Sequence, residues 1–176
     1  MGMLKIVTSP DPRRTKVDKR LRQKALPVQS FDDSLRSLLQ DMRETMMTAR
    51  GVGLAGPQVG EMLRIAVVHI PAGYDDDDDP EINLDLINPE ILRAGGQEVT
   101  LEGCLSFPDL VGEVPRYATV VVRARDASGK EFRVKARGYL ARALQHEIDH
   151  LEGILATDRA IDPRSFALRS EVLKQG

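Results

Sequence analysis

A His-Glu-x-x-His motif is the feature of this sequence that most restricts how the chain can fold. It spans His146–His150, inside a stretch of helical composition, Tyr139–Leu151, that is flanked by Gly138 and Gly153. In a helix the two histidines occupy positions i and i+4, on one face and one turn apart, so both imidazoles can reach one divalent cation. Glu147 then lies beside the open side of that cation, where it can handle a proton. The sequence therefore predicts a metal-binding helix.

A hydrolytic metal site needs a third protein ligand and an open position for water. The chain has one cysteine, Cys104, which rules out an intrachain disulfide, and only three histidines. Cys104 follows a glycine that allows close backbone approach, and a thiolate is a strong metal ligand. The third histidine ends an apolar run and is interpreted as structural. From the residues alone, the open candidates for the third ligand are Cys104, His69, Glu102, Asp149 and Glu152.

Apolar periodicity predicts helices at both ends of the chain and strands between them. Hairpin signals outnumber strand-helix-strand repeats, which favours antiparallel pairing. We therefore expect an α+β fold in which mostly antiparallel small sheets pack around the central metal-binding helix, with an N-terminal and a C-terminal helix. The expected elements are a helix from Leu35 to Met46, a buried strand over 63–70, a hairpin of strands 119–126 and 131–137, and a last helix over 163–174.

Charge and length limit the classes of protein that this chain can belong to. Its 176 residues suit a single domain over 1–176, and 25 Lys and Arg against 27 Asp and Glu give a net charge of −2. That balance is not typical of a dedicated nucleic-acid binder, so no DNA partner is expected. No apolar run approaches the roughly 20 residues that span a bilayer, and the start lacks a signal peptide's apolar stretch. We expect a protein that is neither secreted nor bound to a membrane.

Two charged segments have no role that the sequence defines. Residues 9–27 are rich in Lys and Arg and bracketed by prolines, which predicts an exposed, irregular basic arm. Asp75–Asp79 is a run of five aspartates that should form an exposed loop, and its spacing does not shape a calcium cage.

Three segments resemble, in order and spacing, the three signature motifs of peptide deformylases. They are Gly51–Gln58 (GVGLAGPQ), Glu102–Ser106 (EGCLS) and Gln145–Leu151 (QHEIDHL). Further similar segments, such as Ile87–Pro89 and Gly138–Arg142, extend the resemblance over nearly the whole chain. It implies a metal-dependent amide hydrolase that removes the formyl group from the N-terminal formylmethionine of newly made polypeptides and releases formate. The location implied is the bacterial cytoplasm, with an organelle as the alternative.

The resemblance also implies which residues act. Cys104, His146 and His150 would ligate one metal ion, generally Fe²⁺, for which Zn²⁺, Ni²⁺ or Co²⁺ can substitute. Glu147 would be the general acid/base. The side chain of Gln58 and the backbone N–H of Leu105 would contact the formyl oxygen.

Other positions would shape the substrate site or support it. We expect Arg142 to line the methionine pocket with its stem while its charged head reaches water. Glu102 and Arg116 would form an ion pair that braces the cysteine loop. The residues expected to contact substrate are Val52, Gly53, Leu54, Gly103, Tyr139, Arg142 and Ala143.

Two rival functions remain open at this stage. A general metallo-endopeptidase shares the histidine motif. A non-catalytic, metal-stabilised module could instead dock at the ribosome through the basic arm or the C-terminal helix. Glu147 and Gln58 argue against the second rival, because a closed structural site needs neither a base nor a donor to an oxyanion. Expected partners are N-formylmethionyl nascent peptides and, transiently, the ribosome.

Overall fold

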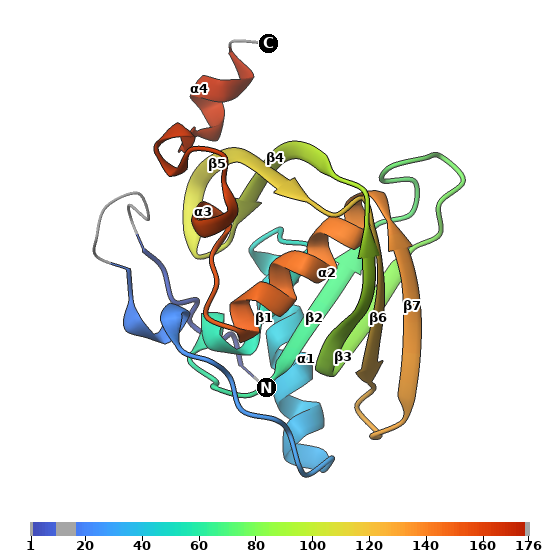
Figure 1. Cartoon of the computed structure of the whole chain (residues 1–176). Helices are drawn as coiled ribbons and strands as arrows, with labels where there is room; N and C mark the ends of the chain where they lie inside the picture. The colour runs from blue at the N-terminus through green and yellow to red at the C-terminus, as the bar shows by residue number, and fades with distance from the viewer. Residues whose placement is uncertain (1, 10–16, 175–176) are drawn as a thin grey trace.

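Two antiparallel sheets and a long central helix form the body of the molecule (Figure 1). The computed structural model of the chain describes residues 2–9 and 17–174. The helical elements are η1 (Lys19–Arg22), α1 (Asp33–Thr48), η2 (Gly56–Val59), α2 (Gly138–Leu151), α3 (Ala156–Arg159), η3 (Pro163–Ser165) and α4 (Arg169–Leu173). The strands are β1 (Gly53–Ala55), β2 (Ile65–Ile70), β3 (Ile82–Gly95), β4 (Glu98–Cys104), β5 (Phe107–Arg116), β6 (Thr119–Arg125), β7 (Glu131–Arg137) and β8 (Ala167–Leu168).

Every pair of neighbouring strands is antiparallel, as the hairpin signals predict. One sheet has the order β1-β2-β3-β6-β7 and the other the order β4-β5-β8. The expected hairpin is confirmed: β6 and β7 pair from Thr119↔Arg137 to Arg125↔Glu131. Asp126 closes its turn by accepting hydrogen bonds from the backbone N–H groups of Ser128 and Lys130. The α+β class predicted from the sequence is therefore confirmed.

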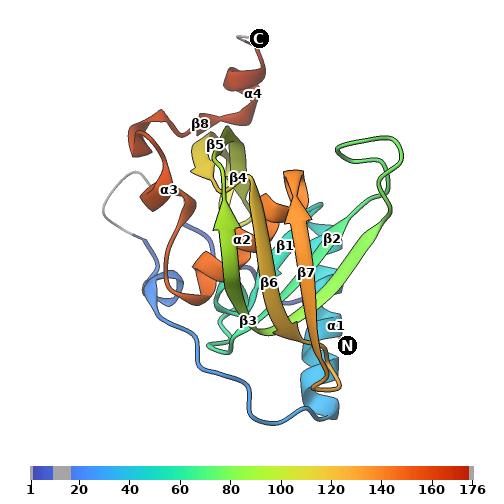
Figure 2. The ribbon, with the colours of Figure 1, turned by 45° about the vertical axis from the view of Figure 1, so that its right-hand side comes forward.

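The two main helices lie on opposite faces of the five-stranded sheet. Successive side chains of a strand point to opposite faces. In β2, Ala66 and Val68 belong to the apolar cluster that includes Leu144 and Ile148 of α2. Ile65 and Val67 belong to the cluster built on Leu35, Leu39, Met42 and Met46 of α1. Because α1 covers only the β1–β2 end of its face, no helix of the described residues lies over the outer surface of β6 and β7 (Figure 2).

The predicted N-terminal helix is confirmed and its start is defined by a cap. The side chain of Asp32 accepts a hydrogen bond from the backbone N–H of Leu35, which satisfies one of the unpaired donors at the start of α1. The helix ends before Ala49, close to Gly51. Its apolar stripe packs on β1 and β2 and holds that end of the sheet in place.

Two predictions about the ends of the chain are wrong in part. The basic arm is not fully exposed, since Leu21 of η1 is buried in a cluster with Phe107 and Leu155; positions 10–16 of the arm lie outside the described residues. The expected helix over 163–174 is broken into η3, β8 and α4. It breaks because Phe166 is buried against the sheet and the next two residues pair with β5.

Among residues 2–9 and 17–174, no helix is long and apolar enough to cross a bilayer.

Candidate metal centre

Three donor atoms from two distant segments converge beside α2. Cys104 is the last residue of β4, while His146 and His150 follow one another on one face of α2. The Cys104 Sγ lies 3.3 Å from His150 Nε2, and the Nε2 atoms of His146 and His150 are 3.1 Å apart. All three donor atoms lie within 4.8 Å of one another. The structure thus brings together the three residues that the resemblance of the three motifs implied as ligands.

The donor set fits a divalent metal ion. With bonds of about 2.0–2.1 Å to nitrogen, two histidine ligands of a tetrahedral ion have their nitrogens roughly 3.3 Å apart, close to the separation seen here. One thiolate and two imidazoles suit Zn²⁺, Fe²⁺ and similar ions. Both histidines are almost fully buried, and Glu147 Oε2 beside them is buried without a hydrogen-bond partner among the residues described. A buried carboxylate oxygen left unpaired is costly, which is consistent with a group that the site is built to receive.

A buried network of charged side chains orients His146. Its Nδ1 lies 2.8 Å from Glu102 Oε2, which directs Nε2 towards the other donors. Arg116 donates to both oxygens of the Glu102 carboxylate, at 3.0 and 2.7 Å, so the expected ion pair is present. Arg142 donates to Glu102 Oε1 at 3.0 Å from the preceding turn of α2. Glu102 therefore orients His146, and Arg116 and Arg142 hold Glu102 in place.

The charges of this network determine how the imidazoles titrate. Burial alone would raise the pKa of Glu102, but His146 and Arg116 outweigh it and hold that pKa well below its usual value. Burial alone would lower the pKa of His146, but the charges of Glu102 and Cys104 outweigh it and hold that pKa well above its usual value. Burial and the charge of His146 together hold the pKa of His150 well below its usual value. The pKa values of the two facing imidazoles therefore shift in opposite directions, and the proton is favoured on His146 over His150.

Glu147 lies in a pocket that is closed on one side by a glycine. A Cβ on Gly53 of β1 would collide with the Glu147 carboxylate, so this position has room for no side chain. Burial raises the pKa of Glu147 to about 7. A carboxyl group with such a pKa can both accept and release a proton near neutral pH.

Gln58 is fixed with its amide nitrogen towards the donors. The backbone N–H of Ala55 donates to Gln58 Oε1 at 2.9 Å. Gln58 Nε2 lies 3.5 Å from Cys104 Sγ and donates to Ser106 Oγ at 3.1 Å. Leu105 lies in the turn between β4 and β5, directly after Cys104. Both groups expected to contact the formyl oxygen thus lie next to the cysteine.

One expectation about the substrate pocket is wrong. The charged head of Arg142 does not reach water: the residue is only 6% exposed, and its guanidinium donates to Glu102 and to the backbone carbonyls of Val114 and Glu98. Two backbone carbonyls and a buried carboxylate offset the loss of hydration of the guanidinium. Arg142 thus ties α2 to both long strands of the smaller sheet.

The other positions expected to contact substrate divide into two groups. Leu54 and Ala143 have side chains in the apolar clusters, and Leu54 points to the α1 side of the sheet, away from Glu147. Val52, Gly103 and Tyr139 are only partly buried. The ring centroids of Tyr139 and Tyr74 lie 4.5 Å apart, and the two ring planes are tilted by 44°.

Besides Glu102, which contacts His146 Nδ1, the other open candidates for the third ligand also have partners elsewhere. His69 Nε2 lies 2.7 Å from Glu81, at the end of β2. Asp149 accepts hydrogen bonds from Arg116 and Arg159. Glu152 pairs with Arg64 at 2.7 Å. Each is therefore structural, as expected for His69.

Three contacts near the site were not foreseen from the sequence. Asp75, from the aspartate run, accepts a hydrogen bond at 2.6 Å from the backbone N–H of Tyr139 and so caps the start of α2. Ser106 holds the amide of Gln58, and it belongs to the cysteine motif that the sequence already marks. Arg159 braces Asp149 from α3, for which the sequence offers no signal.

Comparison with known proteins relates both the sequence and the fold to one family. The family model described as polypeptide deformylase matches residues 3–165. A peptide deformylase of Thermomicrobium roseum is 52% identical over 162 residues, which cover 92% of this chain and 88% of the relative. A crystal structure of a peptide deformylase from Legionella pneumophila superposes with a TM-score of 0.79 at 40% identity, covering 98% of this chain and 92% of the other. A peptide deformylase from Synechococcus elongatus in complex with actinonin gives a TM-score of 0.80 at 38% identity, covering 98% and 86%.

Proposed function

We propose a specific reaction for this chain, which belongs to the polypeptide deformylase family and is a hydrolase of the deformylase type. It removes the formyl group from N-terminal formylmethionine in a metal-dependent reaction, with Glu147 as general acid/base. The observation that carries the proposal is the convergence of Cys104, His146 and His150 beside the unpaired carboxylate oxygen of Glu147. A purely structural metal site would not need that carboxylate.

Cys104, His146 and His150 would hold the metal ion. A divalent cation bound there supplies Lewis acidity and lowers the pKa of water to near neutrality. The resemblance to peptide deformylases implies Fe²⁺ as the physiological ion, with Zn²⁺, Ni²⁺ or Co²⁺ as substitutes, and a thiolate with two imidazoles accepts all four. Glu102, held by Arg116 and Arg142, keeps His146 turned towards the ion.

Glu147 moves the proton. Its carboxylate takes a proton from the attacking water and passes it to the amine that leaves when the formyl C–N bond breaks. A pKa raised by burial to about 7 suits both halves of this transfer, because the group is partly ionised at neutral pH. The packing of its carboxylate against Gly53 restricts the positions that it can adopt.

Gln58 and Leu105 stabilise the oxygen that gains negative charge. The Gln58 amide is held by Ala55 and Ser106 with its nitrogen towards Cys104, so its N–H groups are aimed before substrate arrives. The backbone N–H of Leu105 would be the second donor. Loss of one such donor costs about 2.7–4 kcal/mol in comparable oxyanion sites.

The walls of the methionine pocket belong to the same proposal. Val52, Gly53, Gly103 and Tyr139 would line it, while Leu54 and Ala143 would contribute only backbone, since their side chains lie in the core. Arg142 is a positioning residue in this account because its charge is fully used by Glu102 and two carbonyls.

The setting of the reaction is also proposed. The family match over 3–165 supports one catalytic domain over 1–176. Since relatives at about 50% identity are bacterial peptide deformylases, we place the activity in the bacterial cytoplasm, on nascent formylated peptides and in transient contact with the ribosome.

Formate release tests the proposal. The protein is reconstituted anaerobically with each metal ion and given formyl-Met-Ala-Ser, and Glu147→Gln is compared with Glu113→Gln, an exposed glutamate of β5. We expect Glu147→Gln to retain the metal and to lose about 10²–10⁴-fold in kcat, while the control keeps wild-type turnover.

Two outcomes would contradict it. Full activity of Glu147→Gln would exclude the assigned acid/base role. Cleavage of internal peptide bonds without formate release would favour the metallo-endopeptidase alternative.

A further inference from the structure

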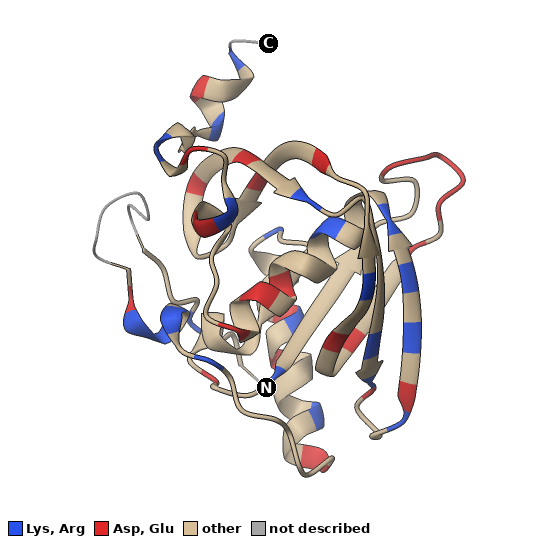
Figure 3. Ribbon diagram, viewed as in Figure 1, with Lys and Arg blue, Asp and Glu red and all other residues tan. Residues whose placement is uncertain are grey.

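The outer surface of the five-stranded sheet carries a concentration of cationic side chains far from the donor cluster. Cross-strand pairing places Arg93, Val121 and Lys135 in one row, and Glu90, Arg123 and Arg133 in the next. The flanking rows add Thr119 with Arg137, and Arg125 with Glu131. Figure 3 shows the cationic positions following one another along β7 and recurring on β6. We call this surface the basic sheet face; its cations are Arg93, Arg123, Arg125, Arg133, Lys135 and Arg137.

The net charge of the basic sheet face is opposite in sign to that of the whole chain. It carries six cations and two acids, a net charge of +4, while the entire chain has a net charge of −2. The remainder of the chain therefore carries −6. Such a separation of charge creates a local positive potential, which the net charge of the sequence conceals.

Most of these cations have no acidic partner. Arg123 pairs with Glu90 at 2.7 Å, and Arg125 donates to the carbonyl of Gly129. Within the part of the chain that the structure describes, the other four, Arg93, Arg133, Lys135 and Arg137, form no ion pair, and all four are exposed. Four unpaired cations on one surface repel one another, and an anion that binds between them lowers this repulsion.

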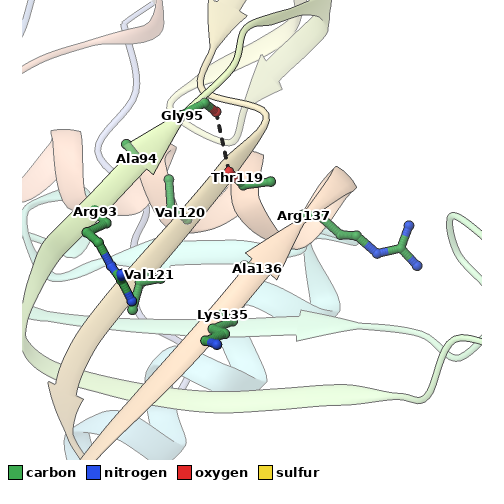
Figure 4. Close-up of a pocket in the computed structure, with 9 residues that line it drawn as sticks. All are labelled: Arg93, Ala94, Gly95, Thr119, Val120, Val121, Lys135, Ala136 and Arg137. Carbon is green, nitrogen blue, oxygen red and sulfur yellow. Dashed lines mark hydrogen bonds between the residues drawn. The ribbon is translucent and has the colours of Figure 1, made fainter.

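An open depression lies among these side chains. It has a volume of about 500 Å³, and its lining includes Arg93, Lys135 and Arg137. In Figure 4 the Arg137 side chain extends away from the other two, and Thr119 is bonded to the carbonyl of Gly95. Val121, on the same face, separates Arg93 from Lys135. Groups of an anionic ligand can therefore enter between the cations without displacing any helix or strand.

We propose that the basic sheet face binds the phosphate backbone of RNA, a binding activity separate from hydrolysis at the metal centre. Every second residue of β7 from Arg133 to Arg137 is a cation, so the charges repeat at about twice the strand rise, roughly 6.8 Å. This spacing is similar to the separation of successive phosphates along one nucleic-acid strand. Three of the four unpaired cations are arginines, whose planar guanidinium matches phosphate in a bidentate manner. No aromatic side chain stands in the rows named above, so the face should contact backbone without selecting bases.

Other anionic partners fit this surface less well. A membrane-binding surface normally adds apolar side chains that enter the lipid. The large apolar side chains exposed on the described part of the chain, among them Met47, Leu101 and Leu173, lie on other elements.

The test is a salt titration of RNA binding with the metal-loaded full-length protein. Fluorescence anisotropy of a labelled 16-base-pair RNA duplex is followed from 50 to 200 mM KCl. With four phosphate contacts, the affinity should fall about 100-fold across this range. Replacing three cations in the variant Arg133→Gln/Lys135→Gln/Arg137→Gln should reduce the logarithmic salt slope by about 3. Formate release should stay unchanged.

A charge-matched control separates this face from the rest of the surface. The variant Lys5→Gln/Lys19→Gln/Lys174→Gln removes three exposed cations from the chain start, the basic arm and the C-terminal end, and should bind RNA as the wild type does. Absence of wild-type binding at 50 mM KCl, equal loss in both triple variants, or tighter binding to phosphatidylserine vesicles or polyglutamate than to RNA would each overturn the proposal.

Discussion

The donor cluster at α2 and the basic sheet face both depend on charged side chains, but they use them in opposite ways. At the cluster, Glu102, Arg116 and Arg142 are buried, and both arginines donate hydrogen bonds to Glu102. On the face, cations such as Arg133 and Arg137 are exposed without acidic partners. A buried charge must find its partner within the fold, whereas an exposed one is free to find it in a ligand. Equal substitutions in the two regions should therefore have very different consequences.

Arg116→Met should give the largest loss of stability. It leaves Glu102 and Asp149 buried without their main counter-charge, and breaking a buried pair costs about 3–5 kcal/mol. The matched change on the basic sheet face, Arg137→Met, should alter the free energy of unfolding by less than about 0.5 kcal/mol. Urea denaturation of both variants measures the difference. Similar losses in the two would remove the distinction between the regions.

Metal removal should lower the stability of the fold but leave RNA binding by the basic sheet face unchanged. With free metal at 1,000 times its dissociation constant, stripping the ion with a chelator should lower the free energy of unfolding by about 4 kcal/mol. Calorimetry before and after dialysis reports this change, and anisotropy with the RNA duplex should be the same in both samples. An unchanged melting temperature would mean that the three donors do not hold an ion in the folded protein.

Arg142→Met tests the role that the structure gives this side chain. Loss of its bonds to Glu102, Val114 and Glu98 should destabilise the fold by about 1–3 kcal/mol. Because Glu102 orients His146, metal affinity should also weaken about 10–100-fold, a readout that a merely structural residue would not move. Arg142→Lys keeps the charge and should lie between the two. A raised KM with unchanged metal affinity would instead restore Arg142 to the substrate pocket.

Asp75→Ala should lower stability less than Arg116→Met or Arg142→Met does, because this acid is exposed but bonded to α2. Removal of the cap from the backbone N–H of Tyr139 should cost about 1 kcal/mol. Asp77→Ala, in the same run of aspartates, is the control and should be neutral, since its side chain is exposed. Thermal denaturation distinguishes them, and equal stability of the two variants would show that the cap contributes nothing.

The parts of the site that the sequence predicts are those that local geometry determines. His146 and His150 stand four residues apart, so their shared face follows from the helix period alone. Cys104 could not be chosen over Asp149 or Glu152 by spacing; only the family resemblance singled it out. In the structure, the turn of α2 carries Asp149 away from the cluster towards Arg116 and Arg159.

What the sequence could not predict depends on contacts between distant segments. Arg142 was expected to reach water, and its actual partners include carbonyls of two strands that lie more than 25 residues earlier. The helix expected over 163–174 is interrupted because residues 167–168 add to the edge of β5. The basic sheet face likewise exists only through cross-strand register, since Arg93 lies about 40 residues from Lys135.

Metal content and coordination test the central claim most directly. The protein is loaded anaerobically with Zn²⁺ or Fe²⁺, the bound ion is quantified, and its ligands are determined by X-ray absorption. We predict one ion per chain with one sulfur and two imidazole ligands, and loss of stoichiometric binding in Cys104→Ala and in His150→Ala. An ion bound without sulfur, or full occupancy in both variants, would contradict the assignment of the site.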